Sequence, residues 1–389
     1  MKNNIWSDKK IIDKIINILL FLVGVNFLHY GQFILPLICL ILFIDNRFKL
    51  RIKNIKLFII LCLFGITFFA FSYKTGFYSV MGLCLPMAYC IGSNMKNVTE
   101  DNVKKIIYIL CFGMCTHLVL NFIYDFTIVG TMVLKKYSHY DIWTGTKVET
   151  TGTAVNYVLI NAAIYYLCLY EKNIKIKYTG IASFVIILIY ELGLGKRAPI
   201  LLLVIAIVIS LVLDFIVLRN RKISENKIKL LLFFLICLVV FIAIVLITNV
   251  FGIRDKLGSL HLVLKFKDGI IDLERIKIFS QATKLIPVYL WGNQTISGII
   301  GINIHDLWFD TYDYAGIIPF ILLVVATIYY LKAMIRVLKN NNIANSNKVL
   351  FLCVCCCSLI WALIEPVMTG SSLFLMISII IISSIGNLN

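Results

Sequence analysis

The long uninterrupted apolar runs constrain this chain more than any other feature. Residues 231–247 read LLFFLICLVVFIAIVLI, without a single charged side chain. An apolar stretch of about 18 residues or more is long enough to cross a bilayer as a helix. The chain is 60% hydrophobic and 15% charged, whereas soluble domains are roughly half apolar and about a quarter charged. We therefore expect an all-α, polytopic integral membrane protein.

Apolar runs of this kind recur along the chain and predict about twelve transmembrane helices. Their expected bounds are 12–28, 31–45, 55–72, 76–93, 103–123, 153–170, 177–192, 198–218, 229–250, 312–333, 347–364 and 369–386. The first run leads directly into further apolar segments and has no small-residue cleavage site, so we do not expect a signal peptide. No internal repeat is visible, and we expect one transmembrane domain over residues 1–389.

The net charge of +17 is unevenly distributed, and its distribution predicts the orientation of the chain. With the N-terminus in the cytoplasm, 24 of the 37 Lys and Arg residues fall in cytoplasmic segments. Seven of the other 13 lie in one long loop, and long loops count little in the positive-inside rule. Both termini are therefore expected in the cytoplasm, and the basic charge calls for no nucleic-acid partner.

Two expected extracytoplasmic loops are long enough to carry function. The first, residues 124–152, is rich in Thr, Tyr and Asp side chains that suit sugar hydroxyls and equally suit any hydrated loop. The second, residues 251–311, contains an amphipathic segment at 270–286. On a helix, Arg275 falls in the middle of the apolar face of that segment. This arginine either snorkels to lipid headgroups or points at a buried anion such as a phosphate.

A second basic feature lies at the outer end of the eighth expected span. Pro199 suits the first turn of a helix, which puts Lys196 and Arg197 at the helix N-terminus. The helix macrodipole disfavours cations at this end, so a bound anion would explain the pair. Interfacial snorkelling is the alternative, and Glu191 is near enough in sequence to pair with either cation.

The stretch NIHDLWFDTYDYAGIIPF, residues 303–320, puts a histidine and three aspartates at the entry to the tenth expected span. On a helix the two kinds of residue fall on different faces. One face holds His305, Phe309, Tyr312 and Gly316, and the other holds Asp306, Asp310 and Asp313. The aspartates are expected on a solvated face near a helix N-terminus, or alternatively as ligands of a hard cation. The histidine is either an interfacial residue with a satisfied hydrogen bond or a functional group.

Other motifs narrow the function classes. All twelve cysteines lie inside apolar runs, so no disulfide framework is expected, and the run CVCCC at 353–357 suits small packing residues. The sequence contains no phosphate-binding nucleotide loop and no nucleophile elbow.

Three stretches together resemble the O-antigen polymerase and O-antigen ligase family of bacterial membrane proteins. The run from His305 through Asp306 and nine further residues to Gly316 and Pro319 resembles that family's histidine motif. Asp306 stands where the family has an amide or hydroxyl residue, and Pro319 also departs from the pattern. GLGKRAPILLL resembles the family's arginine at the outer start of a helix.

In that stretch the arginine is Arg197, with Lys196 in place of a serine. The third stretch, residues 273–292, resembles the family's outer-loop pattern. Its matching residues are Arg275, Phe279, Ala282, Pro287 and Gly292. The order of the three stretches and the large loop before the last spans also match the family.

The resemblance implies a GT-C-like membrane glycosyltransferase that needs neither a metal nor another cofactor. Its substrates would be undecaprenyl-pyrophosphate-linked oligosaccharides, as donor and acceptor, in the bacterial cytoplasmic (inner) membrane. It would polymerise repeat units of O-antigen, capsule or a related polysaccharide, with a chain-length regulator and a flippase as partners. Ligase-type transfer to a lipid or protein acceptor and a polysaccharide transporter or flippase are the alternatives.

The resemblance also suggests roles for individual residues. Arg197 and Arg275 would hold positive charge where the leaving pyrophosphate develops negative charge. His305 would be the general base for the acceptor hydroxyl, because an imidazole titrates near neutral pH. Lys196, Asp306 and Tyr312 are expected to bind substrate, with Asp306 orienting the imidazole or the acceptor sugar.

Overall fold

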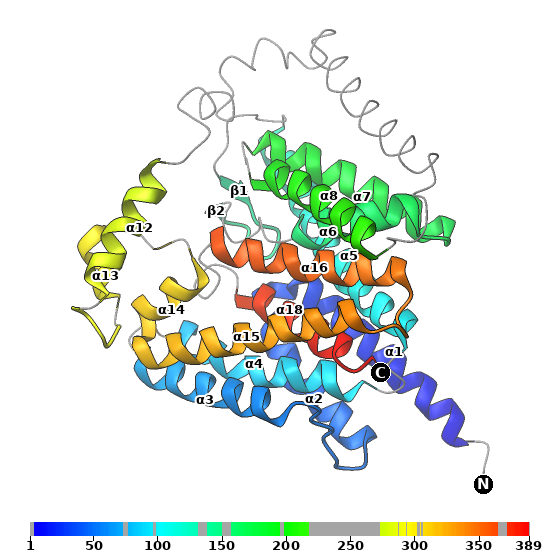
Figure 1. The fold of residues 1–389 in the computed structure, drawn as a ribbon. Helices are drawn as coiled ribbons and strands as arrows, with labels where there is room; N and C mark the ends of the chain where they lie inside the picture. Colours follow the sequence, from blue (N-terminus) through cyan, green and yellow to red (C-terminus); the bar gives the residue numbers. More distant parts are fainter. Residues whose placement is uncertain are drawn as a thin grey trace. The chain divides into compact units, whose positions relative to one another are not determined.

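The chain is mostly helical. The computed structural model describes residues 4–72, 77–95, 99–130, 138–149, 157–194, 198–217, 273–286, 288–292, 294–301, 304, 306–364 and 372–388. The described part is 82% helical, with 14 α-helices and one two-stranded sheet (Figure 1). Three of its helices are long and apolar enough to cross a membrane: Glu100–Val129, Ile317–Lys339 and Asn345–Leu363. The all-α class and the presence of helices able to span a membrane are therefore confirmed.

The observed helices follow the expected spans closely. The first eight are α1 Asn4–Val25, α2 Gly31–Asp45, α3 Ile55–Phe71, α4 Phe77–Asn94, α5 Glu100–Val129, α6 Val158–Leu169, α7 Ile174–Gly193 and α8 Ala198–Val217. The later ones are α12 Leu273–Leu285, α13 Thr295–Ile300, α14 Leu307–Ala315, α15 Ile317–Lys339, α16 Asn345–Ile364 and α18 Ser372–Ile385. A short 3-10 helix, Phe27–His29, joins α1 to α2. The expected span 229–250 and the loop up to residue 272 lie outside the described residues.

The expected tenth span, 312–333, is wrong at its start. Two helices, α14 and α15, meet there at Gly316, whose φ is 83° and ψ −168°. Only glycine adopts this conformation readily, so the helix breaks at this residue. Pro319 then lies in the first turn of α15, where its missing N–H leaves no helical hydrogen bond unmade. The helix that is long enough to span a membrane therefore begins at Ile317.

The chain divides into two compact units. Unit 1 comprises Met1–His117, Leu273–Asn347 and Ser358–Asn389, and unit 2 comprises Leu118–Asp272 and Lys348–Cys357. The expectation of one transmembrane domain over residues 1–389 stays a prediction.

Close helix crossings build unit 1. A Cβ on Gly113 would lie 2.9 Å from the Cα of Gly24, and a Cβ on Gly65 would lie 2.8 Å from the carbonyl oxygen of Gly82. Small residues of this kind let helices approach closely inside membranes. Helix α3 packs on α4 and α15, and α18 packs on the same two partners (Figure 1). Helix α14 packs on two of these helices, α15 and α3.

Helix α6 is the centre of unit 2. All of its residues from Val158 to Leu167 are buried. The amide of Asn161 donates to the carbonyl oxygen of Pro199 at 3.1 Å, and Pro199 lies in the first turn of α8 as predicted. On the same helix, Asp214 accepts hydrogen bonds from the hydroxyls of Tyr165 at 2.8 Å and Tyr170 at 2.6 Å. These hydrogen bonds join α6 and the residue that follows it to α8.

The cysteine run packs inside unit 2. Cys353, Cys355 and Cys357 are buried on α16, and the hydroxyl of Ser210 donates to the sulfur of Cys353 at 3.1 Å. Every cysteine in the described part of the chain is free. The expected packing role of this run is confirmed.

A small hairpin occupies much of the first expected loop. Helix α5 continues to Val129, beyond its expected end, and the hairpin follows as β1 Ser138–Tyr140 and β2 Lys147–Glu149. The strands are antiparallel, with His139 opposite Val148. The loop is therefore partly regular structure.

Candidate functional site

The structure describes the six predicted site residues unequally. Lys196, Arg197 and His305 lie outside the described residues. Arg275 is described by its backbone alone, within α12. Asp306 and Tyr312 are described in full, at the start of α14 and within it. The meeting of Arg197, Arg275 and His305 in one cavity therefore stays a prediction.

Asp306 is the N-cap of α14. Its Oδ1 accepts hydrogen bonds from the backbone N–H groups of Trp308 and Phe309, both at 2.9 Å. Burial raises the pKa of this carboxyl to about 6, although the two N–H groups act to lower it. Aspartate, asparagine and serine all cap helices well. An amide or hydroxyl side chain at this position could therefore form the same cap.

The expected solvated face of aspartates is wrong, because Asp310 and Asp313 are both buried, at 1% exposed. Asp313 caps the neighbouring helix α13, since its Oδ1 accepts from the N–H groups of Ile296 at 2.9 Å and Ser297 at 3.2 Å. Burial raises the pKa of Asp313 as well. In the part of the chain that the structure describes, no three His, Cys, Asp or Glu side chains are grouped as metal ligands. Two of the three aspartates instead bind backbone N–H groups of two different helices.

Tyr312 joins α14 to the end of α12. Its ring is buried in a cluster with Ala282, Ile296 and Ile304. Its hydroxyl donates to the carbonyl oxygen of Ile286 at 2.7 Å. The predicted contact of Tyr312 with substrate is disfavoured by this geometry, because its ring is enclosed and its hydroxyl is already bonded within the fold.

The glycines of the outer-loop pattern and of the histidine motif touch each other. A Cβ on Gly292 would lie 2.6 Å from the backbone nitrogen of Gly316, and a Cβ on Gly316 would lie 2.6 Å from the carbonyl oxygen of Leu290. The N–H of Ile317 donates to the same carbonyl at 3.0 Å. The two patterns, separate in the sequence, therefore form one packed substructure of unit 1.

The position of Arg275 lies near the start of α12, and the other end of this helix packs into the substructure. Positions 275, 279, 282 and 286 recur at helical spacing along one stripe. Ala282 on that stripe is fully buried, while Gln281 and Lys284 are exposed, as expected of the amphipathic helix. Arg275 precedes Ala282 by about two turns, or roughly 10 Å along the axis. Ala282, at the other end of this stripe, packs in the cluster that contains Ile304, the residue before His305.

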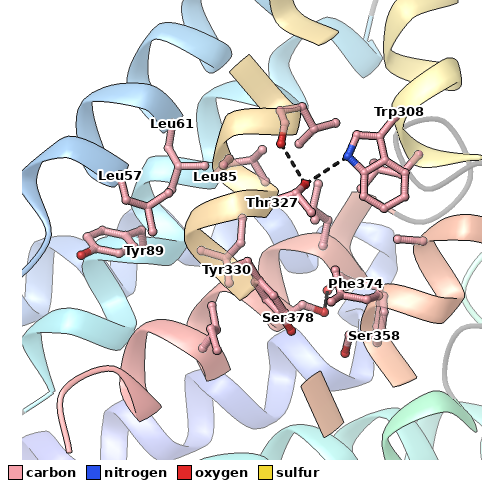
Figure 2. A pocket seen from close by; sticks show the side chains of 18 residues that line it. Leu57, Leu61, Leu85, Tyr89, Trp308, Thr327, Tyr330, Ser358, Phe374 and Ser378 are labelled. Carbon is pink, nitrogen blue, oxygen red and sulfur yellow. Dashed lines mark hydrogen bonds between the residues drawn. The ribbon is translucent and has the colours of Figure 1, made fainter. Parts of the chain in front are cut away.

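An apolar cavity of about 60 Å³ adjoins α14 in unit 1 (Figure 2). Its walls come from α3, α4, α14, α15, α16 and α18, and Figure 2 shows Trp308 beside Thr327. The indole N–H of Trp308 donates to the hydroxyl of Thr327 at 3.0 Å. The hydroxyl of Ser378 donates to the carbonyl oxygen of Phe374 at 2.9 Å. Because these polar groups are bonded within the wall, the cavity offers a hydrocarbon surface.

Unit 2 contains a second group of buried polar side chains, which the sequence places in a hydrated loop. The N–H of Tyr140 donates to Asp125 at 3.2 Å, and the N–H of Ile142 donates to Asn121 at 3.0 Å. His139 is buried, with its ring edge-on to that of Tyr190 at 6.4 Å. The one-turn spacing of Asn121 and Asp125 on α5 was the signal available for this contact. The group holds the hairpin on the helices of unit 2.

No protein-family model matches this sequence, and no curated protein matches it. The fold is that of a mostly helical protein with helices able to cross a membrane.

Proposed function

We propose that this chain is a membrane glycosyltransferase that polymerises lipid-linked oligosaccharide repeat units on the outer face of the bacterial cytoplasmic membrane. The observation that carries the proposal is the packing of the outer-loop pattern against the histidine motif, through Gly292, Gly316 and Tyr312. A shared site requires these two patterns to lie together. Their contact supports the resemblance, because it brings together two patterns that are separate in the sequence.

The proposal includes about twelve spans in a GT-C-like arrangement, with both termini in the cytoplasm. Described helices occupy every expected span other than 229–250, which supports this topology. The charge distribution along the short loops supports the orientation. The outer loop and the histidine motif would then face the side on which lipid-linked repeat units are joined.

In the proposed reaction, an acceptor sugar hydroxyl attacks the anomeric carbon of the donor glycan. The bond from that carbon to the pyrophosphate oxygen breaks, and undecaprenyl pyrophosphate leaves with the electron pair. His305 takes the hydroxyl proton as general base. Arg197 and Arg275 stabilise the charge on the leaving pyrophosphate, with Lys196 beside them. No cofactor enters this scheme.

Asp306 acts in this scheme as a positioning residue. Its carboxylate fixes the first turn of α14 through Trp308 and Phe309, and the backbone that it fixes follows His305 directly. The apolar cavity beside Trp308 supports a lipid substrate, because apolar cavities stay dry and accept apolar groups. A section of the isoprenoid chain of the carrier would lie there.

Polymer length in a host that supplies the repeat unit tests the proposal. His305→Ala and Arg275→Ala are each expected to abolish the long polymer ladder at matched expression. Lys284→Ala, on the exposed face of α12, is the control and is expected to leave the ladder intact. If the His305→Ala and Arg275→Ala variants both made full-length polymer, the proposed catalytic mechanism would be wrong.

Two alternative functions give different results in the same host. Ligase-type transfer predicts intact polymer that is not attached to its final acceptor. If the protein is a transporter or flippase, purified protein in detergent should not lengthen the glycan of undecaprenyl-pyrophosphate-linked oligosaccharide. We expect longer chains, because transfer needs no membrane gradient.

A further inference from the structure

The turn between α12 and α13 presents three apolar side chains outward. Val288, Leu290 and Trp291 are 67%, 44% and 63% exposed. The backbone beneath them is fixed, because Ile317 donates to the carbonyl oxygen of Leu290 at 3.0 Å and Val288 donates to that of Leu285 at 3.0 Å. A rigid turn that displays adjacent large apolar side chains indicates a contact surface.

This turn lies at the end of a helix that is long enough to cross a membrane. Its partner Ile317 is the first residue of α15, whose 23 residues extend about 35 Å. A bilayer's hydrocarbon core is about 30 Å thick, so the ends of α15 would lie near its two edges. The turn that is bonded to one end would therefore lie at one edge.

The apolar surface of the turn continues onto α3. The ring of Trp291 lies 6.0 Å from that of Phe71, the last residue of α3. Further along α3, the side chains of Leu63, Ile66 and Phe69 are also exposed. An apolar helix with an exposed apolar stripe suits hydrocarbon chains. The turn thus extends a lipid-facing stripe at its end.

We propose that residues 288–291 insert at the headgroup–acyl boundary of the bilayer that α15 crosses, and anchor the outer-loop segment there. Tryptophan is enriched at this boundary because its ring is apolar and its N–H remains hydrated. Val288 and Leu290 supply the hydrocarbon contacts beside it. The sequence alone predicts that residues 288–291 belong to an extracytoplasmic loop. In this proposal they are part of the membrane surface.

The anchor sets the depth of α12. The helix ends at Leu285, close to the inserted turn, and its exposed side chains Gln281, Thr283 and Lys284 are polar. This end of α12 thus lies at the level of lipid phosphates. Side-chain exposure, backbone hydrogen bonds and the contact of Trp291 with Phe71 support this position of the turn, and none of them depends on the proposed glycosyl transfer.

Fluorescence of the full chain in phosphatidylcholine vesicles tests the position of Trp291. The difference between wild type and Trp291→Phe isolates the emission of this residue, and Trp143→Phe serves as the control for a tryptophan on the hairpin of unit 2. We expect lipids brominated near the headgroup end of the acyl chain to quench the Trp291 emission several-fold more than aqueous iodide does. Quenching by iodide with no response to brominated lipid would place the turn in water and overturn the inference.

A charge placed in the turn tests the same surface without a probe. In nanodiscs, Val288→Asp is expected to lower the Tm, because a carboxylate at the boundary loses hydration. Gln281→Asp is the matched control on the exposed face of α12 and is expected to leave the Tm unchanged. An unchanged Tm for both would overturn the inference. A change from dimer to monomer in Val288→Asp would also overturn it, because a second copy of the chain would then cover the turn.

Discussion

The cap at Asp306 gives the start of α14 a pH dependence. Burial raises the pKa of this carboxyl from 3.8 to about 6, so the folded state holds a proton that the unfolded state releases. The free energy of unfolding should therefore fall as the pH rises from about 4 to about 6, by about 2 kcal/mol within this window. The Asp306→Asn variant keeps a side-chain oxygen that can cap the helix, and its amide does not titrate.

Denaturant unfolding in detergent micelles between pH 4 and pH 7 measures this dependence. The wild type is expected to lose stability relative to Asp306→Asn as the pH rises through the window. Parallel curves for the two proteins would show that the cap is not buried in the way described.

Gly316 forms the break between α14 and α15. Its φ of 83° and ψ of −168° suit glycine almost alone, and a Cβ there would meet the carbonyl oxygen of Leu290 at 2.6 Å. Gly316→Ala is expected to lower the free energy of unfolding by about 1–3 kcal/mol. Gly298→Ala, in α13, has open space around the added methyl group and should be neutral or stabilising. Equal Tm values for the two variants would contradict the described junction.

Individual residues also show which features the sequence could predict and which it could not. The apolar stripe of α12 was predictable because helical periodicity is local. The burial of Asp313 was not, because its capping partners Ile296 and Ser297 lie 17 and 16 residues earlier in the chain. A carboxylate that pairs with distant backbone N–H groups has the same local sequence as a solvated one. The roles of His305, Arg197 and Lys196 stay predictions, because these three residues lie outside the described residues.

At the scale of elements, hydropathy predicted the bounds of the helices well. It predicted poorly where a helix is interrupted within an apolar run. The expected span 31–45 coincides with α2. The break between α14 and α15 was missed because the apolar run continues across it, although a glycine followed by Pro319 is a recognised stop and start signal. The hairpin was missed because its short strands are held by α5 rather than by their own pattern.

The wall of the apolar cavity provides a prediction about α15. Ala326 lines the cavity, whereas Ala333 on the same helix does not. Ala326→Phe fills the space and is expected to raise the KM for the lipid-linked donor several-fold, while Ala333→Phe leaves it unchanged. Overpacking costs about 1–3 kcal/mol, so the Tm of each variant is measured first. If the folded Ala326→Phe protein had an unchanged KM, the cavity would not be part of the donor-binding site.

At the scale of the whole molecule, the charge distribution predicts the orientation. The positive-inside rule, applied to the short loops, predicts that both termini lie in the cytoplasm, and the proposed topology then puts the two ends of α15 on opposite sides of the membrane. Gly301 lies before α14 and Asn342 follows α15, and both are exposed in turns of unit 1. A pair of insertions at these positions therefore tests both the topology and the span.

Alkaline phosphatase inserted at Gly301 is expected to be active, because that position would face the periplasm, where its disulfides form. The same reporter at Asn342 should be inactive, and a green fluorescent protein at the C-terminus should fluoresce. If both phosphatase insertions report the same side, α15 does not cross the membrane. The turn at Trp291 would then lie at no membrane edge, and the histidine motif would have no outer face on which to join glycans. If the two sides are reversed, the span holds and the orientation is wrong, which would move the proposed site to the cytoplasm.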